Sequence, residues 1–283
     1  MRTDNTLKSV LREGKNILKS ENIENYSLDC DVFMMYVTGF QKIELFTKDD
    51  TLLSGEIVDK FFMCIEKRKN KIPVQYIVGE CEFMGLMFTV NENVLIPRPD
   101  TEILVEKVIS LIDENKSKTL LEIGTGSGCI PISICHYRDV IFTTCDISEK
   151  AIETAKINAK NNNVSDKITF LKSDIFENVS DKFDIIVSNP PYIRTEVIKT
   201  LMDEVRLNEP KTALDGGEDG LYFYRKILEN GKNYLNENGY IAFEIGFDQG
   251  NDLKNLFLEN GYLDIEIIKD LAGLDRVAVG KLK

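Results

Sequence analysis

The sequence predicts an α/β fold in which a doubly wound, seven-stranded sheet follows a small helical domain. Three observations support this prediction. Apolar residues recur at helical spacing up to about residue 70, strand-like and helix-like segments alternate beyond Asn93, and a glycine-rich loop follows the first of those strands. Sheets of this kind bind ligands at the carboxyl ends of their strands, so we expect the functional site there.

Residues 1–72 are expected to form the helical domain. Their apolar residues fall on helical faces, and Ser27 and Ser54 stand where N-caps are expected. Residues 73–92 are expected to link the domains, with a hairpin over Glu82–Val90 and Gly85 near its turn. The sheet domain then spans residues 93–283.

The sheet domain is predicted from alternating patterns. A helix is expected to start near Asp100, behind two prolines that hold an extended entry, and to bury Leu104, Val105 and Val108. Further helices are expected over residues 129–137 and 148–162, the second capped by Ser148. The expected strands are residues 119–123, 140–145, 168–171, 184–187, 240–245, 263–268 and 276–280.

The composition limits the kind of protein this can be. Of 283 residues 43% are hydrophobic, and no apolar run approaches the ~20 residues that cross a bilayer. Residues 1–5 lack the apolar core of a signal peptide, so we expect a cytoplasmic protein without membrane contacts. The 6 cysteines are scattered without a Cys-x-x-Cys pair, which favours buried thiols and no metal site.

The charge balance bears on partners. A formal net charge of −12 argues against a protein that follows a nucleic-acid backbone, because phosphate contacts depend on clustered lysines and arginines. An acidic enzyme suits a cationic cofactor or a basic protein partner. The only histidine, His136, falls near the end of an expected helix and is a poor candidate for a catalytic base.

The glycine-rich loop indicates the cofactor. It does not fit the nicotinamide pattern Gly-x-Gly-x-x-Gly, because the sixth position from Gly124 is Cys129. Its Gly-x-Gly-x-Gly spacing, with Glu122 two residues before the first glycine, resembles the first motif of class I S-adenosylmethionine-dependent methyltransferases. The expected cofactor-binding residues of the loop are Gly124, Thr125, Gly126, Ser127 and Gly128.

Two acidic residues follow the next strands. Asp146 ends the second strand, where a carboxylate can hold both ribose hydroxyls of S-adenosyl-L-methionine. After the third strand, Asp174 can accept a hydrogen bond from the adenine amine and Ile175 can pack on the ring. Either aspartate could instead cap the helix that follows it.

The tetrapeptide Asn189-Pro190-Pro191-Tyr192 after the fourth strand predicts methylation of a planar nitrogen. Such a nitrogen is a poor nucleophile until acceptors hold its N–H groups in line with a methyl donor. The Asn189 side-chain oxygen and the Pro190 carbonyl can each accept one N–H, and Tyr192 offers a ring for stacking. An ordinary turn is the alternative, because Asn-Pro and Pro-Pro are common loop signals.

With these residues the chain resembles the release factor glutamine methyltransferases over nearly its whole length. The resemblance implies that the sheet domain has the class I fold of S-adenosylmethionine-dependent methyltransferases. It implies methyl transfer from S-adenosyl-L-methionine to the glutamine of the Gly-Gly-Gln motif in class I peptide-chain release factors. It rests on Ile72–Gly79, Leu95–Glu102, the glycine loop, Asn189–Ile193, Glu209–Pro210 and Ala213–Leu221.

The resemblance also implies roles for parts of the chain. The helical domain would dock the release factor, and Asn189 would contact the donor as well as the glutamine. Asn189, Pro190 and Tyr192 would be catalytic. The substrate would be held by Asn189–Tyr192 together with Arg98, although Asp100 in the same segment could simply cap a helix. Ile175 replaces the tryptophan expected in some members, so adenine packing would be looser. We expect a monomer with no direct nucleic-acid contact.

Three other functions remain open from the sequence. A related enzyme that methylates glutamine in ribosomal protein L3 would share the tetrapeptide and the donor loop. An adenine N6 DNA methyltransferase would share the tetrapeptide but need a basic recognition region. A non-catalytic S-adenosylmethionine-binding module would not need an intact tetrapeptide. Leu214–Gly220 could be a mobile lid or a surface loop, and we favour the loop.

Overall fold

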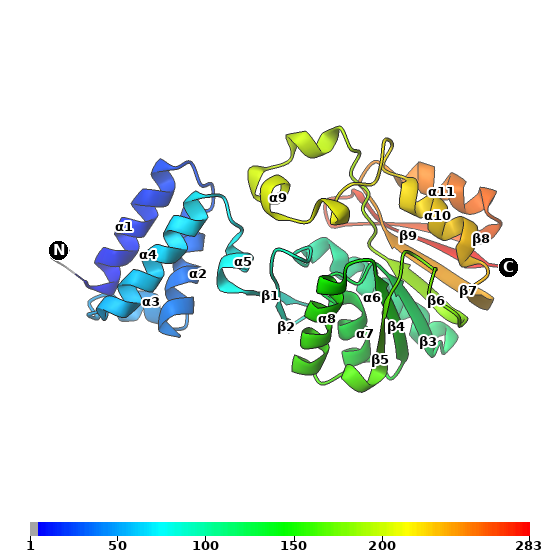
Figure 1. Ribbon diagram of the computed structural model, residues 1–283, viewed down its shortest axis with the longest axis horizontal. Helices are drawn as coiled ribbons and strands as arrows, with labels where there is room; N and C mark the ends of the chain where they lie inside the picture. The colour runs from blue at the N-terminus through cyan, green and yellow to red at the C-terminus, as the bar shows by residue number, and fades with distance from the viewer. Residues whose placement is uncertain (1–4) are drawn as a thin grey trace. The chain divides into compact units, whose positions relative to one another are not determined.

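The computed structural model describes residues 5–283, and these form two compact units (Figure 1). The smaller contains the chain up to Gly79 together with Asp203–Asn208, and the larger contains Glu80–Met202 and Glu209–Lys283. The chain therefore passes between the units three times. Residues 1–4, which include the start of the expected helical domain and most of the segment judged for a signal peptide, lie outside the described residues.

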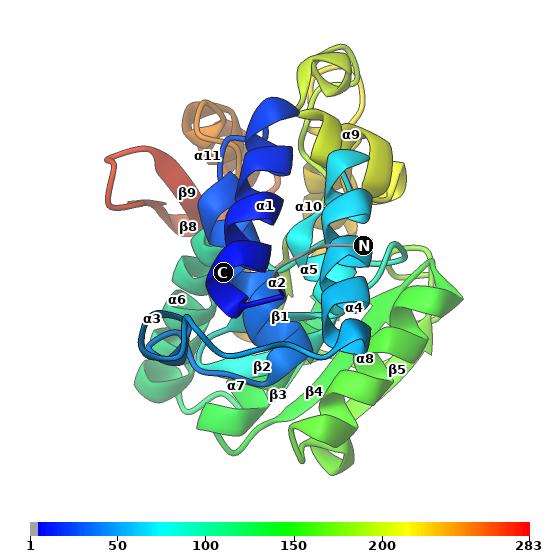
Figure 2. The ribbon, with the colours of Figure 1, turned by 90° about the vertical axis from the view of Figure 1, so that its left-hand side faces the viewer.

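The smaller unit is helical. Its helices are α1 (Leu7–Ser20), α2 (Tyr26–Thr38), α3 (Glu44–Thr47), α4 (Gly55–Lys69), α5 (Val74–Val78) and α9 (Asp203–Asn208). Figure 2 shows α1, α2 and α4 side by side, and Leu7, Phe33 and Phe61 are fully buried among them. Gly14 allows the close approach of α1 and α4, because a Cβ there would lie 2.7 Å from the Phe61 ring.

The two expected N-caps in this unit differ in outcome. Ser54 caps α4, since its Oγ accepts a hydrogen bond from the Ile57 N–H at 3.3 Å. The prediction for Ser27 is wrong. The chain is already helical at Tyr26, so Asn25 is the residue at the cap position, and its side chain makes no cap hydrogen bond. Ser27 lies inside the first turn of α2. An N-cap residue has to come before that turn to accept hydrogen bonds from its free N–H groups.

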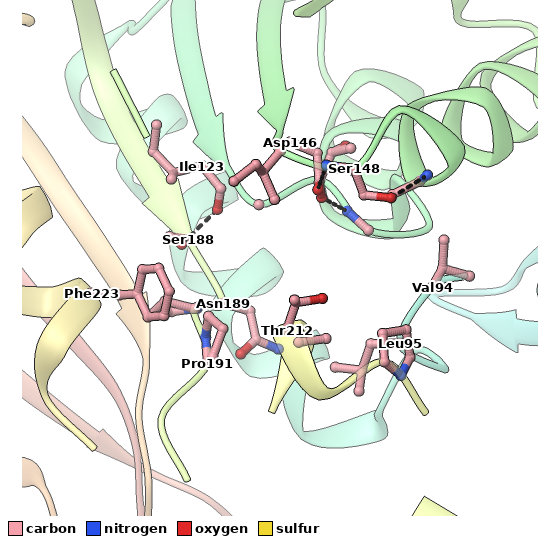
Figure 3. Close-up of a pocket in the computed structure, with 18 of the residues that line it drawn as sticks. Val94, Leu95, Ile123, Asp146, Ser148, Ser188, Asn189, Pro191, Thr212 and Phe223 are labelled. Carbon is pink, nitrogen blue, oxygen red and sulfur yellow. Dashed lines mark hydrogen bonds between the residues drawn. The ribbon is translucent and has the colours of Figure 1, made fainter. Parts of the chain in front are cut away.

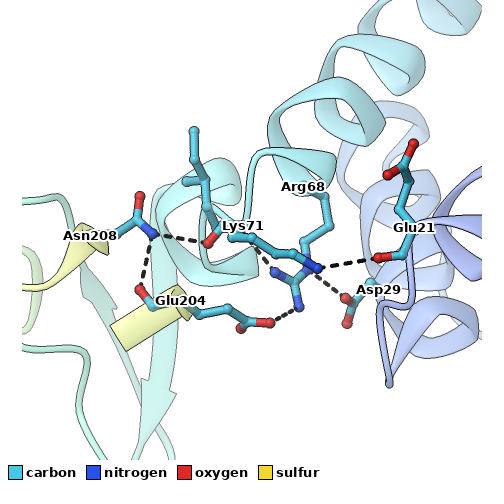
Figure 4. Close-up of polar contacts among 7 residues, drawn as sticks. Glu21, Asp29, Arg68, Lys71, Glu204 and Asn208 are labelled. Atoms are coloured by element: carbon cyan, nitrogen blue, oxygen red, sulfur yellow. Dashed lines mark hydrogen bonds and ion pairs between the residues drawn. The ribbon is translucent and has the colours of Figure 1, made fainter. Parts of the chain in front are cut away.

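Helix α9 is held in the helical unit by polar contacts (Figure 4). Arg68 is 4% exposed; its Nε donates to Asp29 Oδ2 at 2.7 Å and its Nη2 donates to Glu204 on α9. Asn208, at the end of α9, donates from Nδ2 to the Lys71 carbonyl at 3.0 Å. One buried guanidinium thus joins two segments that are far apart in sequence.

The larger unit contains the predicted doubly wound sheet of seven strands, ordered β5-β4-β3-β6-β7-β9-β8. Its strands are β3 (Thr119–Ile123), β4 (Ile141–Asp146), β5 (Ile168–Lys172), β6 (Phe183–Ser188), β7 (Leu235–Glu244), β8 (Tyr262–Lys269) and β9 (Asp275–Leu282). The pairs from β5 to β7 are parallel, and β9 is antiparallel to both of its neighbours. Strand order reverses between β3 and β6, and ligands bind at such a point.

Helices cover both faces of the sheet (Figure 1). Those of the larger unit are α6 (Pro99–Asn115), α7 (Cys129–Tyr137), α8 (Glu149–Asn161), α10 (Tyr222–Gly231) and α11 (Gly250–Glu259), with short 3₁₀ turns at Ser165–Lys167, Val197–Thr200 and Lys211–Ala213. Successive residues of a strand point to opposite faces. Leu120 accordingly lies in the core under α6 and α7, and Leu121 lies in the core under α10 and α11.

The segments that lead into the sheet belong to the larger unit. The hairpin of β1 (Glu80–Phe83) and β2 (Leu86–Thr89) turns at Gly85, as predicted. Asn158 of α8 anchors it: Oδ1 accepts from the Thr89 N–H at 2.7 Å, and Nδ2 donates to the Thr89 carbonyl at 2.9 Å. Helix α6 begins at Pro99, and Asp100 pairs with Arg276 at 3.2 Å instead of capping it.

Over residues 5–283, none of the helices has both the length and the apolar character that crossing a bilayer requires.

Candidate active site

A cavity of about 620 Å³ opens at the carboxyl ends of β3, β4, β5 and β6, within the larger unit (Figure 3). Figure 3 shows Val94 and Leu95 on one side, Asn189 and Phe223 on another, and Asp146 with Ser148 between them. Of the residues expected in the site, the cavity is lined by Arg98, Gly124, Thr125, Gly126, Ser127, Asp146, Asp174, Ile175, Asn189, Pro190 and Pro191. Gly128 and Tyr192 do not line it.

The glycine loop exposes backbone to the cavity. Gly124 has φ +84° and Gly126 has φ +52°, and a Cβ at either would meet nothing within 4 Å. That open space lets a ligand approach the main chain closely. Gly128 has a different reason to be glycine, because a Cβ there would lie 2.9 Å from Ile132 and 3.0 Å from Ala155. The absence of a side chain at Gly128 lets the end of the loop and the start of α7 pack closely against α8.

Asp146 is held by backbone at the end of β4. Its Oδ2 accepts from the Gly126 N–H at 3.0 Å, and its Oδ1 accepts from the Ser148 N–H at 2.8 Å (Figure 3). Burial raises the pKa of Asp146, and these N–H groups lower it. Ser148, as predicted, caps α8 by accepting from the Ala151 N–H at 3.2 Å. The capping alternative for Asp146 therefore does not apply.

Ile175 is strained where the adenine was expected. Its φ is +50°, a region that β-branched residues rarely adopt. Two side chains hold its carbonyl: Cys145 Sγ donates at 3.3 Å and Ser173 Oγ donates at 3.1 Å. Such strain persists only where neighbours enforce it and is common at functional sites. Asp174 and Ile175 both face the cavity.

Glu122, the acidic residue before the first glycine, lies fully buried under the loop. Thr144 donates from Oγ1 to Glu122 Oε2 across the β3–β4 pair. Burial raises the pKa of Glu122 to about 8, and the hydrogen bond from Thr144 opposes that rise. This carboxyl group is therefore largely protonated at neutral pH, beneath the surface that the cavity presents.

The tetrapeptide follows β6 directly. Ser188 Oγ donates to the Ile123 carbonyl at 2.6 Å and so ties the ends of β6 and β3 together. Asn189 Nδ2 donates to Thr101 Oγ1 at 3.2 Å, and the Tyr192 hydroxyl donates to Glu244 Oε1 at 3.1 Å. Burial, and then the nearby Glu244 carboxylate, raise the pKa of Tyr192 well above its usual value, so the phenol stays protonated.

Leu214–Gly220 packs on the tetrapeptide instead of standing apart from it. The Ile193 N–H donates to the Leu214 carbonyl at 3.1 Å, and the Gly216 N–H donates to the Ile193 carbonyl at 2.8 Å. A Cβ at Gly216 would lie 2.7 Å from the Tyr192 Cα. These contacts tie the segment to Tyr192 and Ile193 at the end of the tetrapeptide.

Arg98 also lines the cavity, at the start of α6. Its Nη2 donates to both carboxylate oxygens of Glu209, at 2.5 and 2.7 Å. The bond joins the segment before α6 to the segment after the tetrapeptide. The cavity is also lined by residues for which the sequence motifs predict no role, and these include Lys211, Thr212, Tyr222 and Phe223.

Thr101 and Glu244 were also missed, although they contact the tetrapeptide. The signal for Glu244 was present, since a lone acid interrupts the apolar run Ile241–Ile245. Thr101 gave no such signal, because a threonine in the first turn of a helix is common. No group of three or more His, Cys, Asp or Glu side chains in residues 5–283 is arranged to hold a metal ion.

Comparisons with known proteins agree with this geometry. A model of the methyltransferase small domain matches residues 99–219, and one of the PrmC N-terminal domain matches residues 9–79. A methyltransferase structure from Pyrococcus furiosus shares the fold, with a TM-score of 0.54 at 20% identity over 76% of this chain and 98% of that one.

Sequence relatives are closer. A release factor glutamine methyltransferase of Clostridium botulinum is 44% identical over 275 residues, which cover 96% of this chain and 97% of that protein. Another, from Aquifex aeolicus, is 39% identical over 269 residues, covering 94% and 95%. The resemblance expected from the sequence motifs and the class I methyltransferase fold are both confirmed. The chain belongs to the release factor glutamine methyltransferase family.

Proposed function

We propose that this enzyme transfers a methyl group from S-adenosyl-L-methionine to the side-chain amide nitrogen N5 of the glutamine in the Gly-Gly-Gln motif of class I peptide-chain release factors. One observation carries the proposal: the glycine loop and Asp146 line the same cavity as Asn189, Pro190 and Pro191. A methyl donor and a planar amide therefore have room to meet in one site. Membership of the family supports the choice of substrate.

The cavity fits S-adenosyl-L-methionine by its own chemistry. Gly124 and Gly126 leave open space beside the main chain, and Asp146 presents a carboxylate fixed by two backbone N–H groups. In this proposal Gly124–Ser127 hold the amino acid end of the donor, Asp146 holds the ribose, and Asp174 and Ile175 hold the adenine. Gly128 shapes the loop without lining the cavity. The bound donor supplies an electrophilic methyl group on a sulfonium.

The tetrapeptide would hold the glutamine amide. Asn189 Nδ2 is engaged by Thr101, which leaves Oδ1 to accept one substrate N–H. The Pro190 carbonyl accepts the other, and the two prolines keep the loop rigid. Tyr192 acts from outside the cavity wall, where its hydrogen bond to Glu244 fixes the end of the tetrapeptide. Rate then comes from positioning, which contributes up to about 7–11 kcal/mol in well-oriented reactions.

The partners follow from the same proposal. Arg98, held by Glu209 at the cavity wall, would contact the substrate backbone near the glutamine. The helical unit would dock the release factor. The enzyme would work as a monomer in the cytoplasm without contact to membrane, and its net charge of −12 argues against direct contact with nucleic acid.

The experiment is transfer of labelled methyl from S-adenosylmethionine to a purified class I release factor, followed by mass mapping of the modified residue. Ribosomal protein L3 and adenine-containing DNA serve as parallel acceptors. Label on the glutamine of Gly-Gly-Gln supports the proposal. Label only on another acceptor assigns the enzyme to that acceptor, and no label on any of them contradicts catalysis on these substrates.

A further inference from the structure

A buried chain of hydrogen bonds runs behind the tetrapeptide. Asn189 Nδ2 donates to Thr101 Oγ1 at 3.2 Å, Thr101 Oγ1 donates to Glu244 Oε2 at 2.5 Å, and the Tyr192 hydroxyl donates to Glu244 Oε1 at 3.1 Å. Thr101 is 2% exposed and Glu244 is 1% exposed. Two residues of the tetrapeptide are therefore tied to one carboxylate at the end of β7, one of them through a hydroxyl of α6.

The direction of each bond in this chain is fixed by Glu244. A carboxylate only accepts, so both hydroxyls that reach it must donate. Burial raises the pKa of Glu244 above its usual value, and the bonds from Thr101 and Tyr192 and the Arg276 guanidinium oppose this rise by stabilising the ionised form, in which both hydroxyls donate to it. Thr101 has a single hydroxyl proton, and this proton is used in the hydrogen bond that Thr101 donates to Glu244. Thr101 can then only accept from Asn189.

This direction decides which end of the Asn189 amide faces the cavity. The two ends of an asparagine amide have nearly the same shape, so neighbours alone select the orientation. Because Thr101 Oγ1 can only accept, the amide group that points toward it is the donor Nδ2. The opposite end, Oδ1, receives no hydrogen bond from any side chain or backbone group of residues 5–283. It is the acceptor left for a ligand, and Asn189 lines the cavity.

We propose that Thr101 and Glu244 are positioning residues that hold the Asn189 amide with its oxygen toward the cavity. The inference rests on the proposed function, since the group received there is the N–H of a substrate amide. The reversed amide would place an N–H donor against the substrate N–H. Two donors would then face each other, both without acceptors, and the substrate nitrogen would lose its alignment with the donor methyl.

The matched variants are Thr101→Val and Thr101→Ser. Valine keeps the shape of threonine but removes the hydroxyl, and serine keeps the hydroxyl. We expect T101V to lower kcat for release factor methylation by roughly 10–100-fold, the range of one lost buried hydrogen bond. The KM for the release factor and the Kd for S-adenosylmethionine should stay within about 2-fold, and T101S should restore most of kcat.

Thr154→Val is the control. Thr154 is also buried, lies on α8 and accepts from an asparagine amide, Asn91 Nδ2 at 3.3 Å, yet neither residue lines the cavity. The T154V variant therefore shows how much kcat changes when a buried threonine hydroxyl outside the cavity is removed. We expect T154V to keep the kcat of the unmodified enzyme, and the melting temperatures of all variants show whether each is folded at the assay temperature.

Three results would overturn the positioning role: unchanged kcat in T101V, equal losses in T101V and T101S, or an equal loss in T154V. An equal loss in T101S would mean that side-chain packing matters and the hydroxyl does not. Failure of the proposed function looks different, because the unmodified enzyme would then methylate another acceptor. The same comparison of variants on that acceptor still tests the orientation of Asn189.

Discussion

Gly220 lies directly against the main chain of Tyr192. A Cβ at Gly220 would come within 2.4 Å of the Tyr192 carbonyl oxygen, and Gln249 Nε2 donates to the carbonyls of both residues, at 3.3 and 3.2 Å. The end of the tetrapeptide is thus clamped between a residue that has no side chain and a buried glutamine. The segment after the tetrapeptide is part of what holds it in place.

Gly220→Ala should therefore damage both stability and turnover. The residue has φ +76°, so alanine is strained there, and the neighbouring backbone has to move. We expect a loss of about 1–3 kcal/mol in unfolding free energy by urea titration. We also expect a fall in kcat that exceeds any change in donor affinity.

Gly273→Ala distinguishes the effect of backbone strain from the effect of a steric clash, because it introduces only the strain. Gly273 has φ +81° in the β8–β9 turn, but a Cβ there would meet nothing within 4 Å. This variant should lose about 1 kcal/mol from strain alone and keep its kcat. If the two variants have the same kcat, the contact between Gly220 and Tyr192 has no role in turnover.

Asn189→Ala and Asp146→Ala should affect different steps. Without Asn189 the amide has no aligned acceptor, so we expect kcat to fall roughly 10²–10³-fold, as when a transition-state hydrogen bond is removed, while donor affinity stays nearly unchanged. Without Asp146 we expect donor Kd to rise roughly 10–100-fold. Calorimetry with S-adenosylmethionine and single-turnover transfer measure the two steps. Unchanged donor affinity in D146A would show that the ribose is held elsewhere.

Arg68→Met should destabilise the helical unit. Arg68 is the buried partner of Asp29, which is 5% exposed, and removing it leaves a carboxylate without compensation. We expect a loss of about 3 kcal/mol on urea unfolding. Glu204→Gln should cost less, because Glu204 is one-third exposed and its amide can still accept from Arg68. Lys60→Met removes the exposed pair with Glu56 and should have little effect. A similar loss of unfolding free energy in K60M would mean that the effect of removing Arg68 does not depend on the burial of its ion pair.

Glu122 should make stability fall as pH rises. Its pKa is about 8 in the folded protein, against an ordinary value of 4.5 that also describes the unfolded chain. Between these values the folded state binds the extra proton, so its stabilising contribution is present at low pH and is lost as pH rises through about 8. We expect Glu122→Gln, which stays neutral, to show a smaller loss of unfolding free energy between pH 5.5 and pH 8.5 than the unmodified enzyme. An identical loss in both would contradict the shifted pKa.

The sheet and the cavity loops could be predicted because their signals are local. Apolar runs of strand length, glycines with a fixed spacing and acids at strand ends need no knowledge of distant partners. The strands β3–β9 form where they were expected, except that β7 begins at Leu235, earlier than the expected Tyr240. The family and fold predicted from the motifs are confirmed. The individual roles of the site residues stay predictions.

What the sequence did not reveal depends on distant contacts. Nothing in Asp203–Asn208 indicates that it packs with Arg68, more than a hundred residues earlier in the chain. The Thr101–Glu244 bond likewise joins the first turn of α6 to the end of β7. Such pairs have no periodic pattern, so only the folded structure brings them together. Ser27 failed as a cap for a simpler reason, because helix starts are uncertain by one or two residues.

The discontinuous helical unit has a consequence for how the chain folds as it is made. Residues up to Gly79 leave the ribosome early, but Glu204 and Asn208 follow only after more than a hundred further residues have been added. Until then Arg68 lacks one of its two acidic partners. The first helices to be synthesised are therefore completed late, and a fragment that ends at Gly79 would correspond to an unfinished intermediate of synthesis.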